Sequence, residues 1–179
     1  GRLESVGNIK NNSKVILDYA HTPDALKYTL ESIKEQFNQS SISIVFGCGG
    51  NRDKDKRPIM GKIANQYCNK IFLTDDNPRY ENPKKIRNQI KKKISRSKLV
   101  EISSRKKAIK VAIDNLKSGD ILIVAGKGHE IYQEYRGKKK NFSDKKYILK
   151  AINLKNKKLF KNWKANILHE QCNLNLVSK

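Results

Sequence analysis

Five short, mainly apolar runs recur along this chain, and each is long enough to form a strand. They lie at residues 15–17, 42–46, 71–73, 99–102 and 121–125. Within the longer runs the apolar residues are mostly consecutive rather than alternating, which is typical of strands that are covered on both faces. The pattern therefore predicts the buried strands of a sheet that has helices on its two sides.

Segments with a helical period fill the intervals between these runs. We expect helices at residues 23–37, 58–67, 83–94 and 105–116. In the first helix Leu26, Leu30 and Ile33 are spaced by three and four residues, so they form one face. Strands that alternate with helices indicate βαβ units. The predicted fold class is α/β, with a Rossmann-like, mainly parallel sheet of about six strands and helices on both faces.

The two ends of the chain differ from this alternating middle. Residues 1–12 are polar and turn-rich, and residues 153–179 are rich in Lys and Asn. The last segment holds Leu159, Trp163 and Ile167 at helical spacing, which fits a terminal helix packed on the sheet. A partly ordered tail fits its composition equally well, so both alternatives stay open.

The balance of charge is strongly basic, with 39 Lys and Arg against 17 Asp and Glu and a formal net charge of +22. A basic face can bind nucleic acid through phosphate contacts and counterion release. Here, however, the lysines are spread over every predicted helix, together with many Asn and Ile residues, as A/T-rich codons produce. Aromatic residues interleaved with basic ones, the stacking platform of single-strand binders, are not evident. We expect no nucleic-acid partner, with a stand-alone basic binding module as the alternative.

The cysteines and the short apolar runs favour a cytoplasmic protein. Cys48, Cys68 and Cys172 are too few for a disulfide framework and fit a reducing compartment. His169 and Cys172 have no second pair at zinc-ligand spacing, so we expect no metal site. No run approaches the length that spans a bilayer, so we expect no membrane partner.

Polar or glycine-rich loops follow four of the apolar runs, at residues 18–24, 47–53, 75–79 and 126–130. In a parallel sheet such loops meet at one edge, where ligands bind. Arg52 and Arg79 offer forks for a carboxylate or a phosphate, and Asp76 and Glu130 offer partners for an amine. A single loop of this kind is ordinary turn chemistry. Four together predict a site for a zwitterionic ligand.

The glycines do not form a familiar nucleotide loop. Residues 47–50 lack the G-x-x-x-x-G-K-[ST] spacing of a P-loop, and Gly126-Lys127-Gly128 resembles a phosphate loop only loosely. Cys48 has no His near it in sequence, which favours a small turn residue over a nucleophile. The sequence predicts no catalytic residue in this chain.

Several motifs occur together and in one order. They are Asp18-Tyr19-Ala20-His21-Thr22-Pro23-Asp24, Phe46-Gly47-Cys48-Gly49-Gly50-Asn51-Arg52-Asp53, Lys56-Arg57-Pro58, Asp76-Asn77-Pro78-Arg79, Gly126-Lys127-Gly128-His129-Glu130 and Phe142-Ser143-Asp144. With this set, residues 1–152 resemble the C-terminal domain of the Mur ligases, and most of all the members that add meso-diaminopimelate. Gly1-Arg2-Leu3-Glu4 resembles the family's junction with its central ATPase domain.

The resemblance implies an ATP-dependent amide ligase of peptidoglycan synthesis. ATP would phosphorylate the D-glutamate γ-carboxylate of UDP-MurNAc-L-Ala-D-Glu, and the amine of meso-diaminopimelate would attack the acyl phosphate. This domain would be the mobile lid that carries the amino acid and excludes water. ATP and Mg²⁺ would be bound mainly by a central domain that is absent from these 179 residues. We therefore expect the chain alone to be inactive.

The resemblance also assigns residues by position. For meso-diaminopimelate they are Arg52, Asp76, Asn77, Pro78, Arg79, Gly126 and Glu130, and for the nucleotide Arg2, Asp18 and His21. Arg79 would bind the distal carboxylate, which lysine lacks, and Glu130 the distal ammonium. Asp18 would suit ribose hydroxyls and His21 the phosphate end. The alternative for His21 is a turn residue that caps the helix at Pro23.

By the same resemblance the chain divides into three parts. Residues 1–12 would be the junction from a central ATPase domain, 13–152 the Mur ligase C-terminal domain, and 153–179 a Lys/Asn-rich extension. A folate-polyglutamylating type of ligase shares the pattern of residues 18–23 and is a further alternative. Asn77-Pro78-Arg79 and the loop at 126–130 argue against it.

Overall fold

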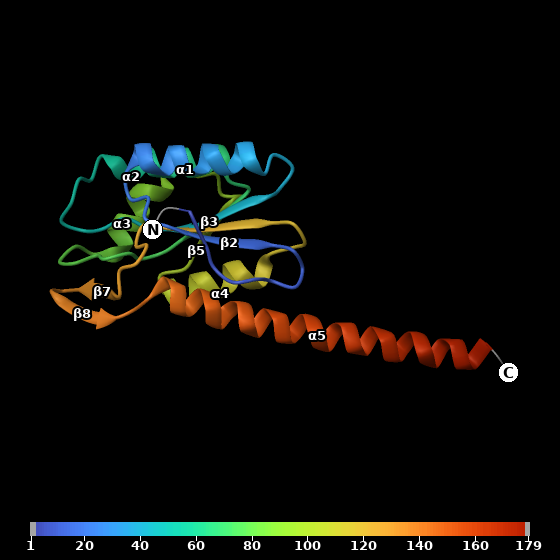
Figure 1. Ribbon diagram of the computed structural model, residues 1–179. Coiled ribbons are helices and arrows are strands. Elements are labelled where there is room, and N and C mark those ends of the chain that lie inside the picture. The colour runs from blue at the N-terminus through green and yellow to red at the C-terminus, as the bar shows by residue number, and fades with distance from the viewer. Residues whose placement is uncertain (1–2, 178–179) are drawn as a thin grey trace.

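A six-stranded sheet forms the centre of the computed structural model, which describes residues 3–177, with side chains as far as residue 166 (Figure 1). Its strands are β1 (Glu4–Ser5), β2 (Lys14–Asp18), β3 (Ile42–Phe46), β4 (Lys70–Leu73), β5 (Leu99–Glu101) and β6 (Ile121–Ala125). They lie in the order β1-β2-β6-β3-β4-β5. All neighbouring pairs are parallel except β1 and β2. The predicted α/β class with a mainly parallel sheet is confirmed.

The last strand of the sheet in sequence lies at its centre. In β6, Ile123 pairs with Ile16 of β2 on one side and with Ile44 of β3 on the other. The carboxyl ends of β2, β6, β3 and β4 therefore lie side by side. Open α/β sheets bind their ligands at this edge.

Five helices cover the sheet: α1 (Pro23–Gln36), α2 (Lys56–Tyr67), α3 (Pro83–Lys91), α4 (Arg105–Asn115) and α5 (Asp144–Val177). Figure 1 shows α1, α2 and α3 on one face, and α4 with the first part of α5 on the other. The predicted helices are confirmed apart from their ends. Helix α2 begins two residues before Pro58, because the first turn of a helix tolerates proline.

Both faces of the sheet are buried, which explains the continuous apolar runs. Leu30 of α1 and Ile90 of α3 pack with Ile44 in one hydrophobic cluster. Ile109 of α4 and Ile148 of α5 belong to the cluster on the opposite face. Each of these side chains is fully buried.

Two pieces of β structure were not predicted. Strand β1 pairs with β2, and Val6 and Ile9, which follow it, are buried in the hydrophobic core. Strands β7 (Tyr132–Tyr135) and β8 (Lys138–Asn141) form a separate antiparallel hairpin. All of β8 is exposed, so its sequence carries no apolar alternation.

The C-terminal segment continues the last helix. Helix α5 runs without a break from Asp144 to Val177 and extends beyond the sheet (Figure 1). Leu159 packs at the edge of the core, but Trp163 is 59% exposed and stacks on Phe160 instead of on the sheet. The helix alternative is thus confirmed, the predicted packing of Trp163 is wrong, and the side chain of Ile167 lies outside the described residues.

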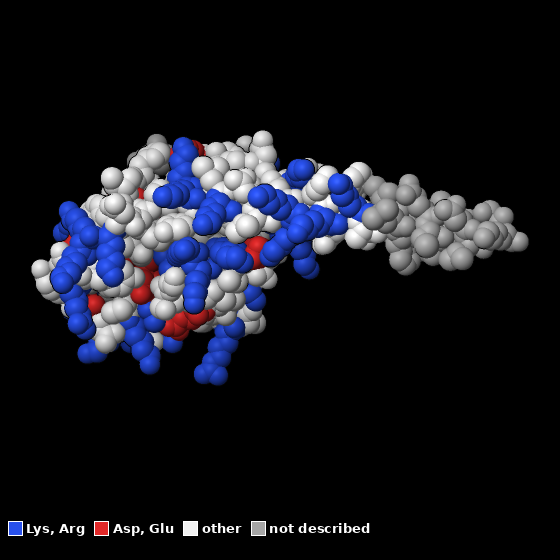
Figure 2. Space-filling model, turned by 90° about the horizontal axis from the view of Figure 1, so that it is seen from below, with Lys and Arg blue, Asp and Glu red and all other residues white. Residues whose placement is uncertain are grey.

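Basic side chains are spread over the surface. Figure 2 shows the face formed by α4 and the described part of α5, where lysines and arginines are scattered with fewer acids between them. Within the part of the chain that the structure describes, no helix has the length and apolar character needed to cross a membrane.

Candidate functional site

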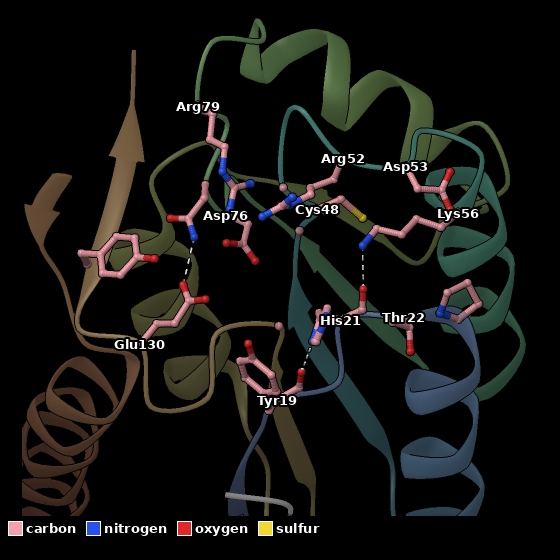
Figure 3. Close-up of a pocket in the computed structure, with 16 residues that line it drawn as sticks. Tyr19, His21, Thr22, Cys48, Arg52, Asp53, Lys56, Asp76, Arg79 and Glu130 are labelled. Carbon is pink, nitrogen blue, oxygen red and sulfur yellow. Dashed lines mark hydrogen bonds between the residues drawn. The ribbon is translucent and has the colours of Figure 1, made fainter. Parts of the chain in front are cut away.

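The loops after β2, β3, β4 and β6 surround a cleft of about 550 Å³. In Figure 3, Arg52 and Arg79 point into it from above and Glu130 from the opposite side, with Tyr19 and His21 along its floor. Asp76, Asn77 and Gly126 also line the cleft. Six of the seven residues predicted for one ligand thus share one cavity, and the seventh, Pro78, is buried beside it.

Two glycines let the loops after β3 and β4 pack directly on each other. A Cβ at Gly47 would lie 2.2 Å from the Thr74 carbonyl oxygen, and one at Gly50 would lie 1.9 Å from that of Pro78. The Gly50 amide donates to the Asn77 carbonyl at 2.8 Å. Only glycine fits at these positions, so the glycine-rich loop serves as a wall that positions the neighbouring loop.

Arg79 is held by contacts with two other segments, the loop at Gly50 and the β7–β8 hairpin. Its backbone has a φ of 51°. Two backbone hydrogen bonds join it to the β7–β8 hairpin: Arg79 N–H donates to the Glu134 carbonyl at 3.1 Å, and Arg136 N–H donates to the Arg79 carbonyl at 2.7 Å. Its guanidinium donates to the Gly50 carbonyl at 2.8 Å and lies 3.6 Å from the Glu134 carboxylate. The side chain is 22% exposed, so part of the fork still faces the cleft.

An acidic side chain, Glu130, lies on the opposite side of the cleft. Glu130 accepts a hydrogen bond from the Asn77 amide at 2.9 Å and one from Lys127 at 2.9 Å. Burial raises the pKa of Glu130, but the Lys127 hydrogen bond and charge hold it below its ordinary value. Asp76 also lines the cleft, and a Cβ on Gly126 would lie 3.0 Å from the Asp76 Oδ2 atom.

The residues predicted for a nucleotide are differently placed. Asp18 is 2% exposed, and its carboxylate accepts from Leu3 N–H at 2.8 Å and Ala20 N–H at 2.7 Å. It therefore holds its loop in shape. His21 is exposed at the cleft, with Nδ1 2.9 Å from the Tyr19 carbonyl oxygen. Arg2 lies outside the described residues.

Thr22, rather than His21, caps helix α1. The Thr22 hydroxyl accepts from Ala25 N–H at 3.3 Å. The N-terminus of this helix lies at the part of the cleft that is lined by His21, Thr22 and Lys56. Helix N-termini favour the binding of anions. The alternative interpretation of His21, as a residue that caps this helix, is therefore wrong.

Sequence reasoning missed two buried cations behind the cleft. Lys127 was noted only as part of a loose phosphate loop, and Arg57 only within a motif. Arg57 is fully buried and binds both oxygens of Glu81 at 2.9 Å. A basic residue next to a glycine or proline, in a loop for Lys127 and in the first turn of α2 for Arg57, was the available signal, but Asn77 and Glu81, to which they donate, lie far away in sequence.

Two other groups near the cleft are structural. Asp75, which precedes Asp76, is buried against Arg87 and accepts from the Tyr135 hydroxyl at 3.2 Å. Burial raises its pKa. Burial also raises the pKa of the Cys48 thiol to about 12, so the thiol stays protonated at neutral pH. This supports the interpretation of Cys48 as a turn residue.

Known proteins resemble both the sequence and the fold. The family model described as Mur ligase, glutamate ligase domain, matches residues 1–128. A Rickettsia felis protein named UDP-N-acetylmuramoyl-L-alanyl-D-glutamate–2,6-diaminopimelate ligase is 46% identical over 158 residues, covering 88% of this chain and 29% of the relative. A solved structure of a ligase of that name has a TM-score of 0.79 and 40% identity, covering 86% of this chain and 31% of its own.

A folylpolyglutamate synthase structure from Thermotoga maritima has a TM-score of 0.53 and 24% identity, covering 70% of this chain and 27% of its own. That likeness shows the fold alone. The chain spans about three tenths of the length of the curated relatives it matches, since 29% and 31% of the first two are covered.

Proposed function

The chain belongs to the Mur ligase family, as its C-terminal glutamate ligase domain, and from this premise we propose that it binds the amino acid for an ATP-dependent amide ligase. The acceptor is UDP-MurNAc-L-Ala-D-Glu and the amino acid meso-diaminopimelate, the compounds in the names of its relatives. The ligase acts in the cytoplasm, in peptidoglycan synthesis. The division into residues 1–12, 13–152 and 153–179 is part of this proposal.

The observation that carries the proposal is that basic and acidic side chains line one cleft together. Arg52, Arg79, Asp76 and Glu130 all line it, and Figure 3 shows Asp76 beside the two arginines and Glu130 across the cleft from them. A guanidinium fork suits a carboxylate, and paired carboxylates suit an ammonium. A diamino diacid has a free amino-acid head group at its far end, which satisfies both kinds of side chain together.

The chain's own role is to bind and to orient. When its distal head group is bound in the cleft, the amino acid can present its other amine to the acyl phosphate. Amide formation needs this proximity between the amine and the acyl phosphate. ATP supplies the activation of the D-glutamate γ-carboxylate. His21 and the start of α1 face the nucleotide in this proposal, while Asp18 acts through the loop it holds.

Mg²⁺ is assigned to no residue of this chain. The described side chains include no cluster of three or more His, Cys, Asp or Glu residues that could hold a metal ion. The ion and the ATP triphosphate would be bound by other parts of the ligase. We therefore expect the 179-residue chain to bind its amino acid but to form no amide bond alone.

Calorimetric titration tests the assignment. The chain should bind meso-diaminopimelate, and bind L-lysine at least about tenfold more weakly, because lysine leaves the arginine end unpaired. Arg79→Ala should remove this preference, while Arg96→Ala, at an exposed position that does not line the cleft, should leave it unchanged. Equal binding by wild type and Arg79→Ala would refute the site.

The basic alternative makes a different prediction. A nucleic-acid module would bind oligonucleotides with a steep dependence on salt, and Arg79→Ala would weaken that binding no more than Arg96→Ala does. The net charge of +22 is the observation behind it. On the face that Figure 2 shows, the basic residues are scattered and not gathered into one patch.

A further inference from the structure

The Lys127 side chain is buried behind the cleft, out of contact with solvent. It is 0% exposed and lies in the loop after β6. Burying an ammonium group is costly unless all of its hydrogens are paired. Lys127 Nζ donates to Asn77 Oδ1 at 3.0 Å and Glu130 Oε2 at 2.9 Å, and lies 3.5 Å from Asp76 Oδ1.

All three partners line the cleft, whereas Lys127 does not. The buried ammonium group therefore contacts the cleft-lining residues from the side that faces away from the cleft. A cation in this place acts on a bound molecule only through those residues.

Lys127 and the Glu134 N–H together determine which way the Asn77 amide points. Asn77 Oδ1 accepts from Lys127 and from Glu134 N–H at 3.0 Å, which leaves the amide nitrogen to donate to Glu130. The flipped amide would set its NH₂ group against two other donors. Since the donor pattern permits one orientation, Asn77 is fixed as a donor toward the acid.

Lys127 also supports the ionised form of Glu130. Burial opposes that form, and the hydrogen bond and charge of Lys127 are the largest effects that lower the pKa again. Lys127 and Asn77 both donate to Oε2. Within the described part of the chain no hydrogen bond reaches Oε1, so that oxygen is available to a ligand in the cleft.

We infer that Lys127 is a positioning residue for the amine end of the site. With the Glu134 N–H, it fixes the orientation of the Asn77 amide. It also holds the Glu130 carboxylate so that one oxygen is available to an ammonium group of the ligand. The inference rests on the proposed function, because it assigns a role in binding a ligand amine.

The chain offers a matched control. Lys155 is also buried, at 7% exposure, but it donates to the main-chain carbonyls of Asp114 and Leu116 at 3.0 and 2.7 Å. Lys155→Met therefore removes a buried lysine, as Lys127→Met does, without touching the cleft. Any effect of a missing buried ammonium on folding should appear in both variants.

The first measurement follows the Glu130 carboxyl carbon by NMR as pH changes, in the full 179-residue chain. In the wild type Glu130 should titrate below its ordinary value. In Lys127→Met the pKa of Glu130 should rise, and in Lys155→Met it should stay unchanged. Equal pKa values in all three proteins would overturn the inference.

The second measurement is calorimetric titration with meso-diaminopimelate at pH 8 and pH 5. Lys127→Met should bind on the order of tenfold more weakly than wild type at pH 8. The ratio should grow at pH 5, because the raised pKa makes Glu130 take up protons more readily in the variant than in wild type. Similar losses in Lys127→Met and Lys155→Met, or a pH-independent ratio, would contradict a positioning role.

The two proposals fail separately. If wild type binds no meso-diaminopimelate, the proposed ligand is wrong, and the Glu130 titration still decides the role of Lys127. If wild type binds it and Lys127→Met binds it equally well, only the present inference fails. Should Lys127→Met not fold, an ordinary or raised Glu130 pKa in wild type would by itself overturn the inference.

Discussion

Arg57 has no exposed side-chain surface, yet it connects three segments behind the cleft. Its guanidinium binds both oxygens of Glu81 at 2.9 Å and donates to the Gly49 carbonyl at 3.1 Å. Glu81 in turn accepts from Asn51 N–H at 2.6 Å. The hydrogen bond from Arg57 lowers the pKa of Glu81 to about 2, against a smaller opposing effect of burial.

This ion pair predicts a pH-dependent stability. A carboxyl group whose pKa is lowered on folding stabilises the protein above its unfolded pKa, here 4.5, and loses that contribution as pH falls toward about 2. Glu81→Gln should therefore destabilise the chain at pH 7, and the difference from wild type should shrink between pH 5 and pH 2. Urea unfolding at several pH values measures it, with the exposed Glu35→Gln as control. A difference that is constant with pH would show that the pair does not act in this way.

A second prediction compares alanine substitutions at two glycines, in order to distinguish the effect of backbone strain from an effect on the cleft. Gly126 and Gly119 both have positive φ, at 110° and 77°, so alanine at either should cost about 1 kcal/mol of stability. At Gly126 the added Cβ would also meet Asp76 Oδ2 at 3.0 Å, whereas at Gly119 nothing lies within 4 Å. Gly126→Ala should weaken binding of meso-diaminopimelate in a calorimetric titration, and Gly119→Ala should not. Equal effects on binding would mean that Asp76 needs no such space.

At the scale of elements, burial decided what could be predicted. Strand β6 is buried throughout, so its sequence is a continuous apolar run that indicates a strand by itself. Strand β8 is exposed throughout and reads as a run of lysines. Its only signal was the turn of Arg136 and Gly137, whose φ values of 49° and 72° suit a two-residue hairpin.

The same reasoning explains the site. The loops that follow buried strands could be assigned to one edge of the sheet, so the charged cleft was predictable. The contacts inside it were not, because Lys127 is 50 positions from Asn77, and Arg57 is 24 positions from Glu81. Pairings across such separations are fixed only by the assembled fold.

The hairpin carries a prediction of its own. Valine at Gly137 would need a left-handed backbone at φ 72°, and its Cβ would lie 2.4 Å from the Tyr80 hydroxyl. A loosened hairpin would release the Arg79 backbone but would leave the buried core intact. Gly137→Val should weaken ligand binding with a small change in the free energy of unfolding, and Gly119→Val, at an exposed turn, is the control. A large loss of stability without a loss of binding would contradict this role.

At the scale of the whole molecule, the loops that line the cleft are anchored on one densely packed sheet. Four neighbouring strands supply these loops, and hydrophobic layers on both faces hold those strands. The Asp18 carboxylate ties Leu3 N–H, at the start of the chain, to the loop after β2 at 2.8 Å. The start of the described chain is therefore fixed directly to a loop beside the cleft.

The hold on Arg79 has a consequence for how substrate choice can evolve. Its side chain contacts the Gly50 carbonyl and Glu134, and its backbone is bonded to the β7–β8 hairpin. Replacing Arg79 alone would leave these groups arranged around a missing cation. Under the proposed function, a switch to an amino acid without the second carboxylate would therefore involve the loop at Gly50 and the hairpin as well as Arg79.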